Sequence, residues 1–270
     1  MLYVVTAVHN RYQITKQFVE RLCQQTYKDI SLVLVDDGST DGTADMVKAL
    51  IPNAVVLQGD GNLWWGGALH LAYKWIKKNA SCSDYVWIAN DDTAFSDDYC
   101  ASALTILKSR DDILLTGYGI SKQTGKQVDG AVNFIFPECA GYRNENTKAY
   151  ENCASTRSLF LKVSHCIKAG GFHPVLLPHY GSDYEWTIRA CRKNKIKVYC
   201  TNELMYEANE ETTGYHDPKT QSIIKIFSKK SMSNPFYKMN FALLAAPWGK
   251  KIASMLYTLT RISKKVRKRP

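Results

Sequence analysis

The stretch Asp84-Tyr-Val-Trp-Ile-Ala-Asn-Asp-Asp-Thr93 is an apolar run that ends in an amide and two acids. Residues 85–89 include β-branched and aromatic types, which predicts a strand that is covered on both faces. Asn90, Asp91 and Asp92 then follow the carboxyl end of this strand, the edge at which ligands bind in open α/β sheets. Adjacent carboxylates there favour a Mg²⁺ or Mn²⁺ site for a diphosphate; a helix N-cap or a solvated turn is the alternative.

Strand, loop and helix alternate in the chain before this stretch. Each expected strand ends in polar or Gly-rich residues. The alternation predicts an α/β fold with a doubly wound, largely parallel, Rossmann-like sheet that is flanked by helices. The expected strands are residues 3–8, 30–35 and 54–57. Helices are expected at residues 15–25 and 68–78, and a further helix is expected to begin at a cap formed by Asp41 or Thr43 and to run through Leu50.

The chain after residue 94 has a different pattern. Gly, Asn and Pro residues in 119–152 predict antiparallel hairpins and loops, so that the sheet as a whole is mixed. The other elements expected in this part are a helix at 99–108, a strand at 113–118, a helix at 184–194 and a strand at 197–200.

Size and composition limit the class of protein. A chain of 270 residues that is 45% hydrophobic can bury a core in one large α/β domain or in a domain with an appendage. No stretch reaches the ~18 uninterrupted apolar residues of a membrane span, and the first residues predict a strand rather than a signal peptide. Eight scattered cysteines show no metal-ligand spacing, which favours reduced thiols and a cytoplasmic location.

Two acids end the second expected strand, and a Gly-rich loop follows the third. Asp36 and Asp37 precede a Gly-Ser turn, where a carboxylate can accept the imide N–H of uracil or thymine; an Asx-turn with a helix cap is the alternative. Residues 59–67 hold two adjacent tryptophans among four glycines. One indole can stack on a base or sugar ring of a ligand; the alternative is that both indoles pack in the core. No GxGxxG follows the first strand, which argues against hydride transfer.

A third acidic group lies at the start of the helix expected at 184–194. Glu185 and Arg189 are four residues apart, so we expect an ion pair that fixes Glu185 and leaves Asp183 facing a cleft. A carboxylate held against a bound hydroxyl can act as a general base. The alternative role for Asp183 is a favourable interaction with the helix dipole.

Charge is distributed unevenly along the chain. Residues 218–270 hold thirteen Lys and Arg and no acid, whereas the net charge of the whole chain is +10. Apolar residues between 250 and 266 recur at three- and four-residue steps, which predicts a basic amphipathic helix. Such a helix suits an anionic membrane surface; the alternative is a helix that folds onto the catalytic body. No groove-reading motif accompanies the charge, so we expect no nucleic-acid partner.

Five motifs occur in the order seen in glycosyltransferases of family 2, which the chain resembles over residues 1 to about 220. They are Thr6-Ala-Val-His-Asn-Arg11, Val35-Asp-Asp-Gly-Ser-Thr-Asp-Gly42, Gly61-Asn-Leu-Trp-Trp-Gly-Gly67, Asn90-Asp-Asp92 and Gly181-Ser-Asp-Tyr-Glu-Trp-Thr-Ile-Arg189. The bacterial rhamnosyltransferase-like members, which build surface polysaccharides, look closest. The resemblance implies a GT-A catalytic domain at 1–225, with a nucleotide-binding half (1–93) and an acceptor half (94–225), followed by a basic helical tail (226–270).

The resemblance also implies roles for single residues. Asp183 falls on the position of the catalytic base, Asp92 on the last acid of the family's DxD, which binds the metal, and Glu185 on the acid two residues after the base. Two departures are Asn90, where many relatives have the first Asp of DxD, and Ser182, where a Glu commonly precedes the base. The donor nucleotide is expected to contact Ala7, Arg11, Asp36, Asp37, Asn62, Trp65 and Asp91, and His216 or Glu207 is a candidate third metal ligand.

Together these features predict a metal-dependent inverting glycosyltransferase. The expected donor is a UDP- or dTDP-sugar, and the expected acceptor is a hydroxyl of a glycan or of a polyprenyl-linked glycan at the inner face of the cell membrane. A catalytically inactive sugar-nucleotide-binding scaffold and a glycosidase are the alternatives. A glycosidase also needs paired carboxylates, but it has no use for a nucleotide pocket or a metal.

Overall fold

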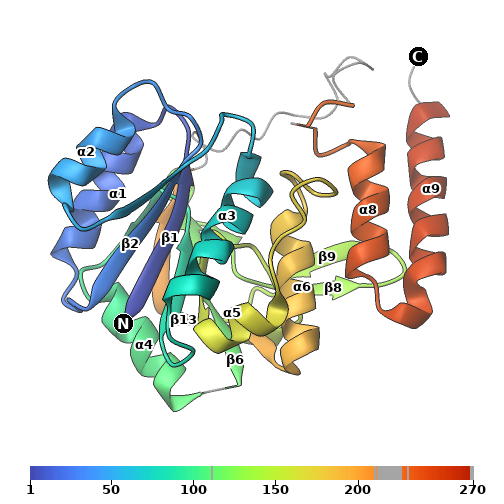
Figure 1. Cartoon of the computed structure of the whole chain (residues 1–270). Coiled ribbons are helices and arrows are strands. Elements are labelled where there is room, and N and C mark those ends of the chain that lie inside the picture. Colours follow the sequence, from blue (N-terminus) through green and yellow to red (C-terminus); the bar gives the residue numbers. More distant parts are fainter. Residues whose placement is uncertain (111, 210, 212–226, 230, 268–270) are drawn as a thin grey trace.

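A computed structural model of the chain has three layers, with helices on both faces of a central sheet (Figure 1). It describes residues 1–110, 112–209, 211, 227–229 and 231–267. The central sheet contains ten strands, eight of which follow the order β10-β13-β6-β12-β4-β1-β2-β3. This is the mixed α/β architecture that the sequence predicted.

The first part of the chain forms four parallel strands with helical crossovers. Their carboxyl ends therefore lie at one edge of the sheet. The strands are β1 (Leu2–Val8), β2 (Ile30–Asp36), β3 (Val55–Gln58) and β4 (Tyr85–Ala89), and the helices are α1 (Tyr12–Gln24), α2 (Thr43–Leu50) and α3 (Trp64–Asn79).

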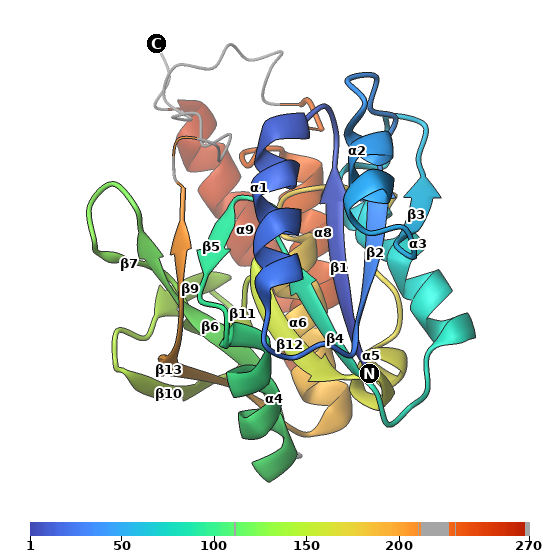
Figure 2. The same cartoon turned by 90° about the vertical axis from the view of Figure 1, so that its left-hand side faces the viewer.

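The second part of the chain extends the sheet and adds antiparallel strands to it (Figure 2). β12 (Ser158–Lys162) runs antiparallel to both of its neighbours, β4 and β6, so its first residue lies at the edge where the parallel strands end. The remaining strands of this sheet are β5 (Thr93–Phe95), β6 (Ile113–Ser121), β7 (Gln127–Asp129), β10 (Lys148–Glu151) and β13 (Lys197–Ala208). The hairpins expected in 119–152 are present, and β8 (Ala131–Ile135), β9 (Ala140–Arg143) and β11 (Cys153–Ala154) form a small second sheet.

Alternate side chains of the strands enter two separate cores. One core packs α1, α2 and α4 (Tyr99–Ser109) on the first face of the sheet, where Trp87 of β4 is fully buried. The other packs α3, α5 (Val163–Ala169) and α6 (Ser182–Asn194) on the opposite face. Because both faces are covered, the central strands β1, β2 and β4 are largely apolar and buried, as the stretch at 85–89 predicted.

The C-terminal segment forms two helices at one end of the molecule (Figure 1). α8 (Pro235–Ala245) packs against α6, and α9 (Lys251–Arg267) follows a short 3₁₀ turn, η2 (Trp248–Lys250), and packs against α8. Among the described residues, no helix is long and apolar enough to cross a membrane.

Some elements are longer than the sequence predicted. α3 begins at Trp64 instead of residue 68, because the carboxylate of Asp37 accepts the backbone N–H groups of Leu63 and Trp64 and so satisfies the first turn. β13 continues to Ala208 instead of residue 200, because after a register shift its second part pairs with β6 and β5. Both extensions depend on contacts with distant parts of the chain.

Candidate active site

The acids that end β2 are bonded to the backbone of nearby loops. Asp36 accepts the N–H of Ser39, three residues on, at 2.8 Å. Asp37 accepts the N–H groups of Gly61, Leu63 and Trp64 at 2.9, 3.2 and 3.1 Å. Both carboxylates are buried. The structure thus shows Asp36 shaping the loop between β2 and α2 and Asp37 shaping the loop between β3 and α3, and their contact with a nucleotide stays a prediction.

Two further residues expected at the donor lie beside Asp37. Ala7 is the residue before Val8, whose carbonyl oxygen accepts the Asp37 N–H at 2.9 Å. Asn62 is exposed and lies between Gly61 and Leu63, the two residues that donate to the Asp37 Oδ1. The structure therefore brings Ala7, Asp37 and Asn62 to one corner of the sheet edge.

Asp91 forms an internal ion pair with Arg11. Its Oδ2 accepts Nε of Arg11 at 3.0 Å and the hydroxyl of Thr15 at 2.8 Å, and its Oδ1 lies 3.0 Å from Nη2 of Arg11. Burial raises the pKa of Asp91, and the guanidinium opposes that rise. The carboxylate of Asp91 is thereby directed into the protein, so the nucleotide contact predicted for Asp91 and Arg11 remains untested.

Asp92 is the acid at this edge that fits a metal. Its Oδ2 is 3.4 Å from Nη2 of Arg11, at the outer limit of a hydrogen bond. Magnesium and manganese are commonly held by one or two carboxylates together with substrate phosphates and water, so a single carboxylate beside a diphosphate is a sufficient protein ligand. Within the part of the chain that the structure describes, no three His, Cys, Asp or Glu side chains gather around one ion.

The candidate third ligands lie elsewhere or outside the structure. His216 is outside the described residues. Glu207 is exposed on β13, where it is paired with Ala94 of β5, two residues beyond Asp92. Neither position adds a metal ligand to Asp92 in the described structure.

A segment just before β12 joins the elements around the site. We name residues 154–158 the central segment. Ala154 exchanges hydrogen bonds with the hydroxyl of Thr187 on α6, at 3.3 and 2.9 Å. Thr156 accepts Nε1 of Trp65, at the start of α3, at 2.9 Å. Trp65 is thereby fixed against the site by its indole N–H.

The central segment also contacts the acid-tipped strand. The carbonyl oxygen of Arg157 accepts the N–H of Asn90 at 2.9 Å. Ser158 is opposite Ala89 in the ladder, and its hydroxyl contacts Nε1 of Trp87 at 3.1 Å and the Tyr99 hydroxyl at 2.7 Å. Through these bonds the position of β12 relative to β4 is fixed at the residue where the acids begin.

Asp183 lies on the first turn of α6, on the far side of the central segment. It is partly exposed, and its Oδ1 accepts the N–H of Tyr184 at 2.9 Å. Burial raises the pKa of Asp183 to about 6; Asp129 adds to the rise, and Arg157 opposes it. A carboxyl group with this pKa is close to the working range of a general base at neutral pH.

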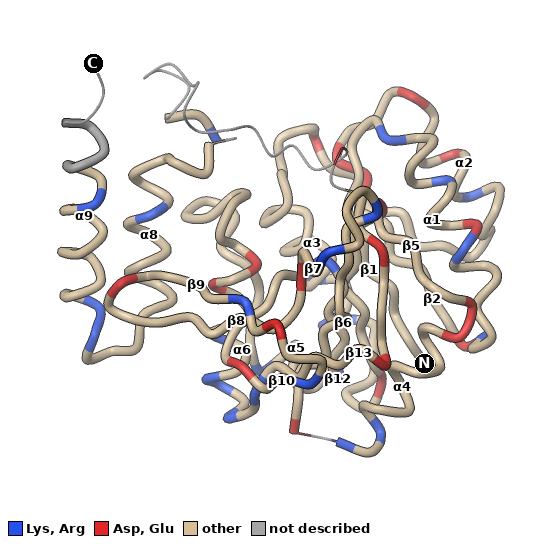
Figure 3. Tube along the Cα trace, turned by 180° about the vertical axis from the view of Figure 1, so that it is seen from behind, with Lys and Arg blue, Asp and Glu red and all other residues tan. Residues whose placement is uncertain are grey.

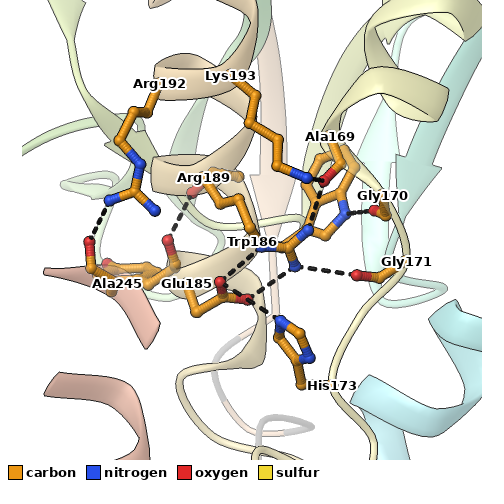
Figure 4. Close-up of polar contacts among 12 residues, drawn as sticks. Ala169, Gly170, Gly171, His173, Glu185, Trp186, Arg189, Arg192, Lys193 and Ala245 are labelled. Carbon is orange, nitrogen blue, oxygen red and sulfur yellow. Dashed lines mark hydrogen bonds and ion pairs between the residues drawn. The ribbon is translucent and has the colours of Figure 1, made fainter. Parts of the chain in front are cut away.

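The next acid on the helix belongs to a structural network (Figure 4). Glu185 is buried and paired with Arg189 through two bonds of 2.7 and 2.9 Å, as the four-residue spacing predicted. Arg189 also donates to the carbonyl oxygens of Ala169 and Gly171 at 2.6 and 3.0 Å, and Trp186 donates to that of Gly170 at 2.7 Å. This network holds α6 against the segment that follows α5. It therefore fixes the position of the first turn of α6, which carries Asp183.

The glycine pair after the tryptophans has a steric role. The N–H of Gly66 donates to the carbonyl oxygen of Pro178 at 2.8 Å. A Cβ atom at residue 66 would be 2.5 Å from the carbonyl oxygen of Leu177 and 3.0 Å from that of Pro178. Only glycine allows α3 to approach the loop that leads into α6 this closely.

Sequence reasoning missed Asp129 and Arg157. Both lie in the region after residue 94, whose irregular loops gave no periodic signal. Asp129 ends β7, and its carboxylate accepts the hydroxyls of Ser155 and Tyr206 at 2.5 and 2.7 Å. Burial acts to lower the pKa of Arg157, but the surrounding acidic groups of Asp129, Tyr206, Asp92 and Asp183 raise it. A buried-strand pattern that begins directly after an arginine, at Ser158, is the one signal that could have singled out Arg157.

Residues 3–167 match the family model described as glycosyl transferase family 2. The chain belongs to this family. It is 26% identical over 246 residues to glycosyltransferase GlyG of Streptococcus pneumoniae. The match covers 85% of this chain and 79% of the relative.

Solved structures of other glycosyltransferases share the fold. A TarS structure from S. aureus, described as a complex with UDP-GlcNAc, superposes with a TM-score of 0.63 at 15% identity and covers 96% of this chain and 72% of that chain. The mannosyltransferase PcManGT from Pyrobaculum calidifontis, described as a complex with GDP-Man and Mn²⁺, gives 0.57 at 12% identity, with 100% and 76% covered. The likeness confirms the GT-A type of fold.

Proposed function

We propose that this glycosyltransferase transfers a hexosyl or deoxyhexosyl group, with inversion, from a UDP- or dTDP-sugar to a hydroxyl of a glycan or polyprenyl-linked glycan. The rhamnosyltransferase-like resemblance supports a place in bacterial surface polysaccharide synthesis. The observation that carries the proposal is that the central segment binds the strand of Asp92 on one side and the helix of Asp183 on the other. This arrangement supports the proposal that a metal-binding carboxylate and a general base act on the same donor sugar.

In the proposed reaction, Asp183 accepts the proton of the acceptor hydroxyl. The acceptor oxygen forms its bond to the anomeric carbon of the donor, and the bond from that carbon to the β-phosphate oxygen breaks with its electron pair on the phosphate. Attack opposite to the leaving diphosphate inverts the anomeric configuration. The pKa of about 6 leaves Asp183 largely ionised at pH 7 and still basic enough to take the proton.

Asp92 is the residue proposed to hold a divalent ion. A bound Mg²⁺ or Mn²⁺ supplies Lewis-acid stabilisation of the diphosphate oxygens. The PcManGT structure is a complex with GDP-Man and Mn²⁺, which supports this assignment. Asp91, held by Arg11 and Thr15, would keep the loop that presents Asp92 in place.

Binding and transfer can be tested separately. A panel of UDP-, dTDP- and GDP-sugars is added to the purified chain with and without Mn²⁺, and the melting temperature is measured, because a ligand that binds the native state raises it. The stabilising donor is then incubated with lipid extract or soluble glycan acceptors, and sugar transfer is followed by mass spectrometry. Stabilisation without transfer to any acceptor would favour the inactive scaffold, and no stabilisation by any nucleotide would contradict the proposal.

The metal assignment has its own variant. Asp92→Ala is expected to abolish the extra stabilisation that Mn²⁺ gives in the presence of the donor. Asp98→Ala, at an exposed carboxylate before α4, serves as the matched control and is expected to keep it. An unchanged Mn²⁺ effect in Asp92→Ala would remove this residue from the metal site.

We further propose that α9 places the enzyme on the inner face of the cell membrane, where a polyprenyl-linked acceptor would be found. α9 packs on the protein through its hydroxyl-bearing side: Ser254 and Thr258 are buried, and Lys250 and Arg261 donate to the carbonyl oxygens of Phe136 and Glu138. The apolar side of the helix faces solvent instead. Its most exposed members are Ile252 (77%), Leu256 and Leu259, and Trp248 (87%) of the preceding turn η2 is exposed as well.

The charges beside this apolar stripe favour an anionic lipid surface. Figure 3 shows Lys and Arg, and no acid, on α8 and α9. Lysine and arginine near an anionic leaflet contribute about 1 kcal/mol each, in addition to apolar burial. A helix with exposed apolar side chains and flanking bases therefore fits a membrane interface better than a purely polar partner.

Flotation with vesicles tests this placement. The wild-type chain is expected to float with vesicles that contain phosphatidylglycerol and less with pure phosphatidylcholine. Ile252→Ser combined with Leu256→Ser should reduce flotation, whereas Val175→Ser, at an exposed apolar residue far along the sequence, should not. Equal flotation of both variants would contradict the role of α9, without affecting the transfer reaction on soluble acceptors.

A further inference from the structure

Arg157 occupies a fixed position between the two proposed catalytic acids. Its carbonyl oxygen is bonded to the N–H of Asn90, two residues before Asp92. The same central segment is bonded to α6, which carries Asp183 on its first turn. The guanidinium is partly buried, and the carboxylates of Asp92 and Asp183 both act on its charge.

The carboxylate of Asp129 lies beside the backbone of Arg157, because the Ser155 hydroxyl that donates to Asp129 also accepts the Arg157 N–H at 3.2 Å. Of the acidic groups around the guanidinium, Asp129 acts on it most strongly. Asp129 is itself immobilised, because it accepts the Gly130 N–H at 2.8 Å and the hydroxyls of Ser155 and Tyr206 at 2.5 and 2.7 Å. A carboxylate that is fixed in this way gives the guanidinium a constant electrostatic partner, which favours pre-organisation for a ligand.

Gly119 leaves space for the hydrogen bond between Tyr206 and Asp129. A Cβ atom at Gly119 of β6 would be 2.7 Å from the hydroxyl oxygen of Tyr206 and 2.8 Å from Cβ of Asp129. Residue 119 must therefore be glycine for Tyr206 to reach Asp129. The Tyr206 hydroxyl is buried, and burial raises its pKa well above the usual value, so it stays protonated and donates to the carboxylate.

The other arginine at this edge is already bound. Arg11 makes two bonds to Asp91, so its charge is compensated inside the protein. In the space beside the central segment, the charges of Asp92, Asp129 and Asp183 act on Arg157, and three carboxylates carry more negative charge than one guanidinium offsets. A diphosphate entering this space would add further negative charge and would need a cation there besides the metal.

We propose that Arg157 binds the diphosphate of the sugar-nucleotide donor and stabilises it as the leaving group. This inference rests on the proposed transferase function, which supplies the donor. As the bond between the anomeric carbon and the β-phosphate oxygen breaks, its electron pair remains on that oxygen, and the guanidinium donates hydrogen bonds to it. Arginine suits this role because its planar fork matches phosphate oxygens.

Nucleotides that differ in one phosphate provide the test. Affinities of UDP, dTDP and GDP, and of the matching monophosphates, are measured by isothermal titration with Mn²⁺ for the wild-type chain and for Arg157→Gln. We expect the affinity for the preferred diphosphate to fall roughly ten- to hundredfold in Arg157→Gln, as for the loss of hydrogen bonds to a charged group. The affinity for the monophosphate should change less than about threefold, which is within the usual scatter of such effects.

Control variants separate a ligand contact from a structural ion pair. Arg143→Gln, at an exposed arginine of β9, should leave all affinities unchanged. Asp129→Asn should keep tighter binding of the diphosphate than of the monophosphate, because Arg157 is still present. Arg157→Lys keeps the charge but not the fork, and it should show a smaller loss than Arg157→Gln; it also serves if the glutamine variant does not fold.

Two results would overturn the inference in different ways. If the wild-type chain binds a diphosphate and Arg157→Gln binds it equally well while melting at a lower temperature, Arg157 is a structural partner of Asp129 and only this inference fails. If the wild-type chain binds none of the three diphosphates, the proposed transferase function fails and the inference falls with it.

Discussion

Three carboxylates on the two sides of the central segment are used in opposite ways. In the parallel half, Asp37 and Asp91 are buried and fully bonded, one to three backbone N–H groups and the other to Arg11 and Thr15. Across the central segment, Asp183 has one bond from the adjacent N–H, and burial raises its pKa to about 6. An acid that is bonded as an anion builds the fold, whereas an acid whose anion is poorly stabilised can accept a proton.

The largest expected effect is on turnover in Asp183→Asn. Removing a general base lowers turnover by about 10²–10⁴-fold. The same change should raise the melting temperature at pH 8, because it removes a carboxylate that is ionised at the expense of stability. Each kcal/mol corresponds to roughly 2–4 °C in domains of about this size. Steady-state kinetics and thermal denaturation measure the two effects, and unchanged turnover would remove Asp183 from the mechanism.

The next effect is expected in the ion pair of the parallel half. Arg11→Met leaves Asp91 buried without its cation, which should lower the free energy of unfolding by about 3–5 kcal/mol. Urea denaturation measures this loss. Arg143→Met, at an exposed arginine, should cost less than about 0.5 kcal/mol. Equal costs for the two variants would mean that Asp91 is not held by Arg11 in solution.

A smaller loss of stability is expected when the backbone N–H groups of the loop after β3 lose the carboxylate that accepts them. Asp37→Asn replaces a carboxylate that accepts three N–H groups with an amide, and it should destabilise the fold by about 1–3 kcal/mol. Asp60→Asn, at an exposed acid of the same loop, is the matched control and should be nearly neutral. If Asp37→Asn keeps full stability but loses donor affinity, Asp37 serves the ligand rather than the loop.

The smallest expected effect is the change of rate with pH. Asp183 must be ionised to accept a proton, so turnover should rise with pH through about 6 and fall about tenfold per unit below it. Because the folded-state pKa is raised above 3.8, the contribution of Asp183 to stability is present below that value and is lost as the pH rises through about 6. A rate profile that stays flat from pH 7 to 5 would contradict the assignment.

The fold could be predicted because its signals are local. Apolar runs such as residues 85–89 and the polar ends of the strands predicted the strands and helices of the first half in their order along the chain. The pairing of Glu185 with Arg189 followed from helical spacing alone. By contrast, the bonds of Asp37 to residues 61–64 depend on two strands lying side by side, which no local pattern encodes.

Arg157 and Asp129 were missed for a similar reason. They lie at the ends of short strands, and their proximity results from the antiparallel insertion of β12 between β4 and β6. A reader of the sequence sees an arginine between Thr156 and Ser158 with no acid near it in the chain. The sequence predicted that the tail is amphipathic, but not that α9 packs through its serine and threonine side.

The packing of α9 has a practical consequence for handling the protein. A row of aliphatic side chains and a tryptophan in contact with water favours self-association, and added salt weakens the repulsion between the flanking bases that opposes it. Purified preparations without detergent are therefore expected to form larger species as ionic strength rises. The apparent mass measured in such buffers would then reflect self-association through the exposed side of α9 rather than a native assembly.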